Sequence, residues 1–170
     1  MDFRTYLRGQ LQFAHNTLEQ VVDGLDGGLL HKTHPGSTSQ CIAAIYAHAV
    51  LAEDGILNGM IMSRAPLFNA DLASKTGVPM NPTPQQNDAW AKSIKMNLPA
   101  FREFARTVYA NTDKIVADMD DATAEAIVDT PLGKQPRQEF IGNLGVTHMW
   151  GHLGEIAALK GVDGLKGLPF

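Results

Sequence analysis

The alternation of apolar and polar side chains predicts a bundle of four long helices. In the first segment, apolar residues recur every three or four positions, which is the spacing of one face of an α-helix. The residues on this face are Phe3, Leu7, Leu11, Ala14, Leu18, Val21 and Leu25. Asp2 precedes them as a candidate N-cap, and glycines at positions 24, 27 and 28 end the pattern.

A second helix is expected over about residues 40–62, with Ser39 as its N-cap. Its apolar face consists of Ile42, Ile45, Ala49, Ala52, Ile56 and Met60. Residues 63–83 have no helical periodicity and are rich in proline, so we expect a long connection there. A connection of this length can run back along the bundle and start the third helix parallel to the second.

The third helix is expected to begin at Thr83-Pro84 and to continue past Pro99 with a kink. Its apolar face consists of Trp90, Ile94, Phe101, Ala105, Val108, Thr112, Ile115 and Met119. Residues 120–128 predict a short helical piece, and a turn-rich stretch then leads into the fourth helix. These patterns predict one all-α domain over residues 1–170, a four-helix bundle with a long crossover between helices two and three.

Composition favours an ordinary soluble domain in a reducing compartment. The chain contains one cysteine, Cys41, so no intramolecular disulfide can form. The sequence shows neither an N-terminal signal segment nor an apolar run long enough to span a membrane, which predicts a cytoplasmic protein. A net charge of -4, with scattered lysines and arginines, argues against nucleic-acid binding.

The fourth helix carries the residues with the clearest chemistry, His148 and His152. They are four positions apart, so both imidazoles lie on one helical face, and Glu155 lies close to them. The apolar residues of this helix share that face, where each unsatisfied polar group costs about 1–3 kcal/mol. A divalent cation satisfies both rings at once, since neutral imidazole is a common metal ligand. A surface pair and hydrogen-bonded core histidines are the alternative interpretations.

A third imidazole is available from the second helix. His48 lies on the flank of the apolar face of that helix, and the small residues Cys41, Ala52 and Gly55 leave room around it for a metal and a ligand. Three protein nitrogens with one open position are typical of a catalytic rather than a structural site. We therefore predict that His48 binds a metal ion together with the two histidines of the fourth helix.

Four further polar residues receive a structural interpretation. His15 lies beside the apolar face of the first helix and is expected at an edge or on the surface. Glu53 is interpreted as a solvated helix charge, with acceptance of an imidazole N–H as the alternative. His31 and His34 lie in a loop rich in glycine, proline and serine, and we expect them to face solvent or the mouth of a pocket.

Two short motifs give the chain a resemblance to the DinB/YfiT-like superfamily of metal-dependent proteins. The segment AHAVLAE at residues 47–53 resembles the motif of that family's second helix. The segment HMWGHLGE at residues 148–155 resembles its closing motif, in which Arg-Gly-Gln frequently follows the second histidine. Leu153 and Glu155 depart from that pattern, while both histidines of the motif are kept.

The resemblance implies a four-helix bundle that binds zinc, nickel or a similar divalent ion through His48, His148 and His152. Relatives include S-transferases that use bacterial thiols such as bacillithiol, and a mycothiol-dependent maleylpyruvate isomerase. We therefore expect a metal-dependent transferase that joins a low-molecular-weight thiol to a small electrophile. Glu155 is the candidate proton acceptor, or a fourth ligand, and family analogy favours a homodimer.

Two other functions are consistent with the sequence. In the first, the ion activates water instead of a thiol, which makes the protein a metal-dependent hydrolase. In the second, the protein is a non-catalytic, stress-related dimer with a structural metal, which predicts a saturated ion and no pocket beside it. Met62 and Trp150 are candidates for the lining of a substrate pocket in the catalytic interpretations.

Overall fold

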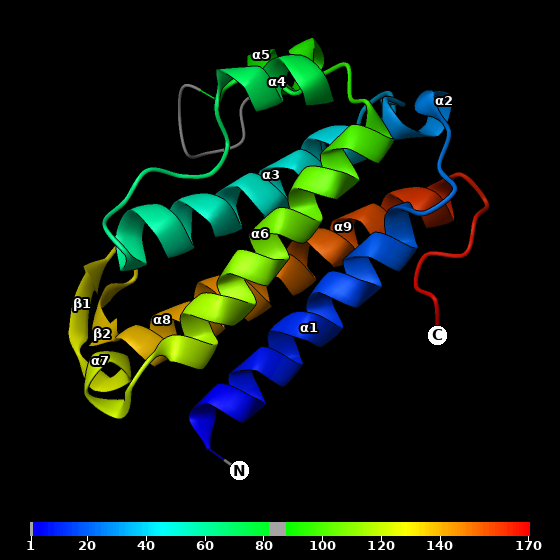
Figure 1. The fold of residues 1–170 in the computed structure, drawn as a ribbon. Coiled ribbons are helices and arrows are strands. Elements are labelled where there is room, and N and C mark those ends of the chain that lie inside the picture. The colour runs from blue at the N-terminus through cyan, green and yellow to red at the C-terminus, as the bar shows by residue number, and fades with distance from the viewer. Residues whose placement is uncertain (1, 82–87) are drawn as a thin grey trace.

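The computed structural model describes residues 2–81 and 88–170, and it contains four long helical segments packed side by side (Figure 1). The principal helices are α1 (Phe3–Val22), α3 (Ile42–Asp54), α6 (Leu98–Asp118) and α9 (His148–Val162). The predicted all-α four-helix bundle is confirmed, because helices make up most of the chain and its only sheet within the described residues has two short strands.

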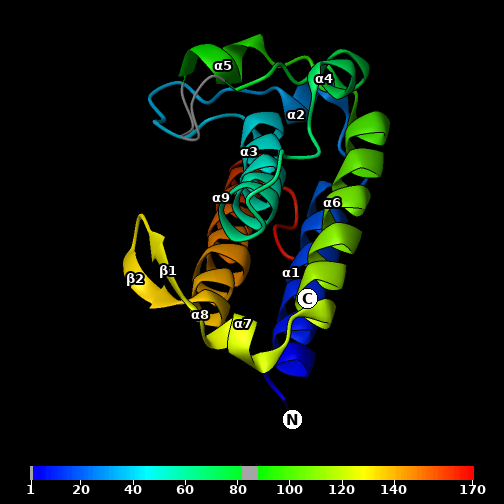
Figure 2. The ribbon, with the colours of Figure 1, turned by 60° about the vertical axis from the view of Figure 1, so that its left-hand side comes forward.

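The four helices close a ring around the core. Helix α1 packs against α6, α6 against α3, α3 against α9, and α9 against α1. The view in Figure 2 separates α3 and α9 on one side from α1 and α6 on the other. Helices α3 and α6 run in the same direction (Figure 1), so the long crossover between the second and third bundle helices is confirmed.

Helix α1 follows its apolar pattern closely. The carboxylate of Asp2 accepts the backbone N–H of Thr5 at 2.9 Å, which caps the first turn as predicted. Helix α3 is different, because nearly every residue from Ile42 to Val50 is buried, as expected for a helix surrounded by neighbours. No helix of the described residues is both long and apolar enough to cross a membrane.

The second and fourth bundle helices each contain a π-helical segment. Helix α3 continues into η1 (Gly55–Ile61), and α8 (Arg137–Phe140) continues through η2 (Ile141–Thr147) into α9. The two π segments contact each other. The predicted cap of the second helix was wrong, because the helix begins after Cys41 and the Ser39 side chain does not cap it.

The described part of the crossover contains more helix than its sequence suggested. It contains α4 (Ala70–Thr76) and α5 (Asp88–Ser93), while the predicted helix start at Thr83-Pro84 lies outside the described residues. The prediction of one kinked helix through Pro99 was wrong. Asn97 caps a new helix there by accepting the N–H of Ala100, and proline in the first turn loses no helical hydrogen bond.

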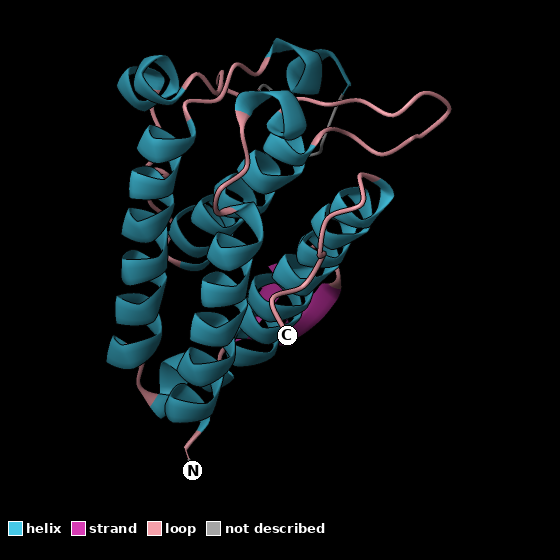
Figure 3. Ribbon diagram, turned by 90° about the vertical axis from the view of Figure 1, so that its right-hand side faces the viewer, coloured by secondary structure: helices cyan, strands magenta, loops and turns pink. Residues whose placement is uncertain are grey.

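Short elements complete the fold. Helix α2 (Gly27–Leu30) follows α1, and α7 (Asp121–Glu125) falls in the predicted helical piece. The turn-rich stretch before the fourth helix forms an antiparallel hairpin, which was not predicted; Figure 3 shows it as the magenta strands. Its strands are β1 (Ile127–Thr130) and β2 (Gly133–Pro136).

Gly77 provides a test of how tightly the crossover packs. It ends α4 with a φ of 69°, and a Cβ at this position would overlap the backbone carbonyl of Lys95. Gly24 has the same φ of 69° but open space around it. We expect Gly77→Ala to lower the free energy of unfolding by about 1–2 kcal/mol from backbone strain plus a further steric penalty. Gly24→Ala should lose only the part of the free energy of unfolding that comes from backbone strain. Equal losses for the two variants in urea unfolding would contradict the close contact of Gly77 with Lys95.

Candidate metal centre

Three histidines meet where α3 packs against α9. His48 comes from α3, and His148 and His152 come from successive turns of α9. The Nε2 atom of His148 lies 3.2 Å from that of His48 and 3.0 Å from that of His152. One nitrogen from each ring lies within 4.8 Å of the other two. The structure therefore brings together the three predicted ligands, which are up to 104 positions apart in the chain.

Burial keeps two of these rings in their neutral form. Each of the three side chains is partly buried. Burial, followed by the repulsion that a protonated His48 would meet from protonated His152 and His148, lowers the pKa of His48 to about 4. Burial and His152 likewise lower the pKa of His148 to about 4, against a smaller opposing effect of Glu155 and Glu53. Neutral imidazole has a free lone pair, which is the form that binds a metal.

The hydrogen bonds of the cluster fit a cation. Glu155 Oε2 lies 2.7 Å from His152 Nδ1, so this ring nitrogen donates to the carboxylate and leaves its Nε2 as an acceptor. His148 has at most one proton on Nε2, so it cannot donate to both neighbouring rings. At least one of the two Nε2–Nε2 contacts therefore cannot be a hydrogen bond and sets two lone pairs or two N–H groups against each other. A divalent ion removes this conflict because it accepts all three lone pairs.

Glu155 lies beside the cluster rather than within it. Its side chain is 49% exposed, and the group of potential metal-binding atoms in the described residues contains the histidines alone. In this arrangement Glu155 orients the imidazole of His152 from the outside of the bundle. Three nitrogens converge, and no fourth protein ligand joins them among the described residues.

Two clefts of the described structure lie away from the histidines. One, of about 230 Å³, contains Met62, and the other, of about 270 Å³, lies between α1 and α6. Trp150 instead packs against Phe13, with ring centroids 5.3 Å apart. Cys41 is buried in the core. The structure therefore does not bring Met62 and Trp150 together as a pocket beside the cluster.

Two sequence interpretations of polar residues were wrong. Glu53 and His15 are 2% and 6% exposed, and Glu53 Oε2 lies 2.8 Å from His15 Nε2. Thr112 donates to the other carboxylate oxygen at 2.5 Å, and the Tyr109 ring stacks on His15. Glu53 therefore accepts an imidazole N–H, as in the alternative interpretation, but from a histidine outside the cluster.

The loop histidines also have structural partners. His31 Nδ1 donates to the carbonyl of Gly27, and its Nε2 accepts the backbone N–H of Met96 at 3.1 Å. His34 Nε2 lies 3.1 Å from the carboxylate of Asp163. Both rings are partly buried, so the solvent-facing interpretation was wrong, and they connect the loop after α1 to distant segments.

Together, the fold and the cluster define a helical-bundle protein with a three-histidine centre between two helices. The chain belongs to the DinB superfamily, whose family model matches residues 10–156. Among solved structures, it is similar to a protein described as a conserved protein of locus from Enterococcus faecalis, with a TM-score of 0.72 and 13% identity. That match covers 95% of this chain and 99% of the other, and it supports the fold alone. No curated protein matched the chain.

The buried Glu53 network predicts a large effect on stability. Glu53→Ala leaves His15 and Thr112 without their shared acceptor, so we expect a loss of about 3 kcal/mol or more in the free energy of unfolding. Glu103→Ala is the matched control, because this glutamate forms an exposed pair with Lys75 and should contribute less than about 0.5 kcal/mol. Denaturant unfolding measures both, and a Glu53 effect as small as the control would contradict the assigned network.

Proposed function

We propose that His48, His148 and His152 bind a divalent metal ion, with zinc or nickel as the expected metals. The observation that supports this is the convergence of three Nε2 atoms on one point, in rings that two helices hold partly buried. Membership of the DinB superfamily is compatible with it. A bound ion would act as a Lewis acid and lower the pKa of a coordinated thiol or water molecule. The deprotonated nucleophile would then be available near neutral pH.

We further propose a thiol-dependent transfer as the reaction. In such a step, the sulfur of a low-molecular-weight thiol forms a bond to an electrophilic carbon while the bond to the leaving group breaks. The thiol proton must pass to a base. Glu155 is the candidate for this base, because its Oε2 holds His152 while its Oε1 has no hydrogen bond within the described residues.

A non-catalytic metal-binding dimer is the second candidate, and a specific observation favours it. The two clefts described above are not lined by any of the three histidines. The proposed homodimer has a candidate face in the aromatic group of Phe13, Trp150 and Phe170. Phe13 and Phe170 are 51% and 69% exposed, and light scattering on the purified protein tests for the dimer mass.

Metal content tests the centre itself. We expect near one equivalent of zinc, nickel or another divalent ion per chain in untagged protein, measured by elemental mass spectrometry. His148→Ala should lose most of this metal because it removes the central nitrogen of the cluster. His34→Ala is the control, since it removes a partly buried histidine that pairs with Asp163 instead. Equal metal in both variants would refute the assigned ligands.

Thiol reactivity separates the candidate functions. Metal-loaded protein should accelerate the reaction of a low-molecular-weight thiol with a small electrophile, and His48→Ala should lose that acceleration. Hydrolysis of an activated ester without thiol would instead support the hydrolase. If metal binds but neither rate rises above that of the metal-depleted protein, the non-catalytic dimer is the better account.

A further inference from the structure

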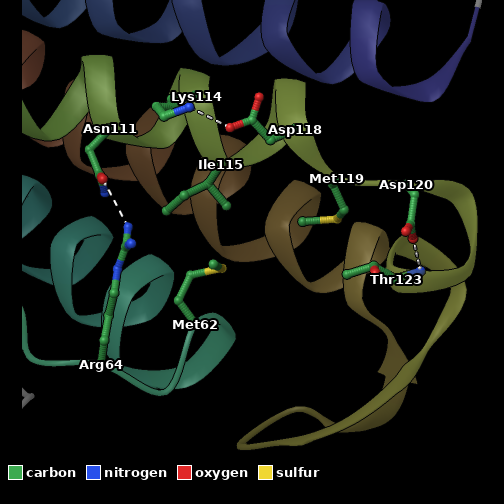
Figure 4. Close-up of a pocket in the computed structure, with 9 residues that line it drawn as sticks. All are labelled: Met62, Arg64, Asn111, Lys114, Ile115, Asp118, Met119, Asp120 and Thr123. Atoms are coloured by element: carbon green, nitrogen blue, oxygen red, sulfur yellow. Dashed lines mark hydrogen bonds and ion pairs between the residues drawn. The ribbon is translucent and has the colours of Figure 1, made fainter.

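The cleft that contains Met62 combines an apolar floor with a charged rim. It has a volume of about 230 Å³ and lies between the end of η1, α6 and α7. Figure 4 shows Met62 and Ile115 at its centre and Met119 beside them. Met62 is 44% exposed, whereas Ile115 and Met119 are 7% and 6% exposed. The cleft therefore offers a hydrocarbon group an apolar surface that is partly open to solvent. We refer to it as the Arg64 cleft.

Arg64 is held at one end of this cleft without a counter-ion. Its Nε donates to Asn58 Oδ1 at 2.7 Å, and its Nη2 donates to Asn111 Oδ1 at 2.9 Å. Within the described residues no carboxylate forms an ion pair with it, whereas Arg8 and Arg102 both have acidic partners. Two neutral amide oxygens therefore orient the guanidinium without neutralising its charge. Arg64 is exposed, so a ligand can reach the guanidinium, whose Nη1 has no protein partner in the described structure.

The backbone between Met62 and Arg64 is unusual. Ser63 has a φ of 51°, and it is the only residue other than glycine with a positive φ in the described part of the chain. This conformation costs a serine free energy, so the surrounding contacts must hold it. Both neighbouring side chains line the cleft, one with a thioether and the other with a guanidinium.

The opposite end of the cleft carries two carboxylates and the ammonium group of Lys114. Asp118 accepts a hydrogen bond from Lys114 at 2.6 Å, and Asp120 accepts the backbone N–H of Thr123 at 2.7 Å (Figure 4). Asn111, which touches Arg64, and Asp118 are two helical turns apart on α6, or about 10 Å. Lys114 offsets one of the two negative charges, so the cleft has a cationic end, an apolar middle and an end with a net negative charge. A ligand with one negative charge therefore fits it better than a ligand with two.

We propose that the Arg64 cleft binds a small amphipathic carboxylate. The carboxylate pairs with the guanidinium of Arg64, whose planar fork matches its geometry, and the hydrocarbon part covers Met62, Ile115 and Met119. A second carboxylate at the far end is disfavoured by repulsion from Asp120, whereas the charge of Asp118 is offset by Lys114. None of the three histidines lines this cleft, so the site is separate from the candidate metal centre and does not depend on it.

Methyl NMR of the methionines tests this site directly, using octanoate as the probe. The chain has seven methionines, and the two in the cleft report on binding there, while Met149 beside His148 reports on the metal centre. The protein is first treated with a chelator, so that octanoate cannot bind through a metal. We expect saturable shifts of the Met62 and Met119 signals, no such shift of Met149, and much weaker effects from octan-1-ol and from the dicarboxylate suberate.

Amino-acid substitutions test whether the guanidinium of Arg64 binds the carboxylate of octanoate. Arg64→Gln should weaken octanoate binding about tenfold or more, because it removes the charge-assisted hydrogen bonds. Arg106→Gln is the matched control on an exposed part of α6 outside the cleft, and it should bind as the wild type does. Met62→Ser changes an exposed side chain, so it keeps the fold while weakening binding. Unchanged affinity in Arg64→Gln or in Met62→Ser, equal binding of octan-1-ol, or no shift in the cleft would each overturn the proposal.

Discussion

The candidate metal centre depends on the packing of α3 against α9. His48 contributes its imidazole from one helix, and His148 and His152 contribute theirs from the other. Because side chains four apart on a helix already lie together, the one long-range requirement is the contact between the two helices. That contact makes three ring nitrogens face one another in a partly buried site. Facing lone pairs repel, so the same packing that forms the cluster also makes it a candidate site for a cation.

The buried polar network around Glu53 differs from the histidine cluster, because its groups are satisfied by protein partners. Glu53 lies on the same helix as His48, but it turns towards α1 and α6, where His15 and Thr112 satisfy it. Such a buried network gains little net stability over apolar packing, yet loses much when one member is removed. In the Glu53 network, the carboxylate, the imidazole and the hydroxyl find their hydrogen-bond partners within the protein. The histidine cluster cannot do so among the described residues, and this difference is the physical basis for assigning a ligand to one and not to the other.

Much of the fold could be predicted because the local spacing of residues determines where the helices lie and which face of each is buried. The spacing of apolar residues located α1, and the four-residue spacing of His148 and His152 placed both rings on one face of α9. The errors share a cause. The burial of His15 and Glu53 depends on Thr112, a partner 59 positions from Glu53 whose contact has no local signal. Pro99 was compatible with a kink or with a new helix, and the structure distinguishes them by ending α5 at Ser93 and starting α6 with Asn97 as its cap. The Arg64 cleft likewise joins segments that no sequence motif connects.

The most direct test of the central claim is X-ray absorption spectroscopy of the protein loaded with zinc. We expect three imidazole nitrogens at about 2.0–2.1 Å from the metal, and a further light ligand that exchanges with added thiol. His148→Ala measured beside the wild type should lose this signature. Failure to bind zinc, or a spectrum without imidazole scattering, would contradict the claim that the packing of α3 and α9 creates a metal site.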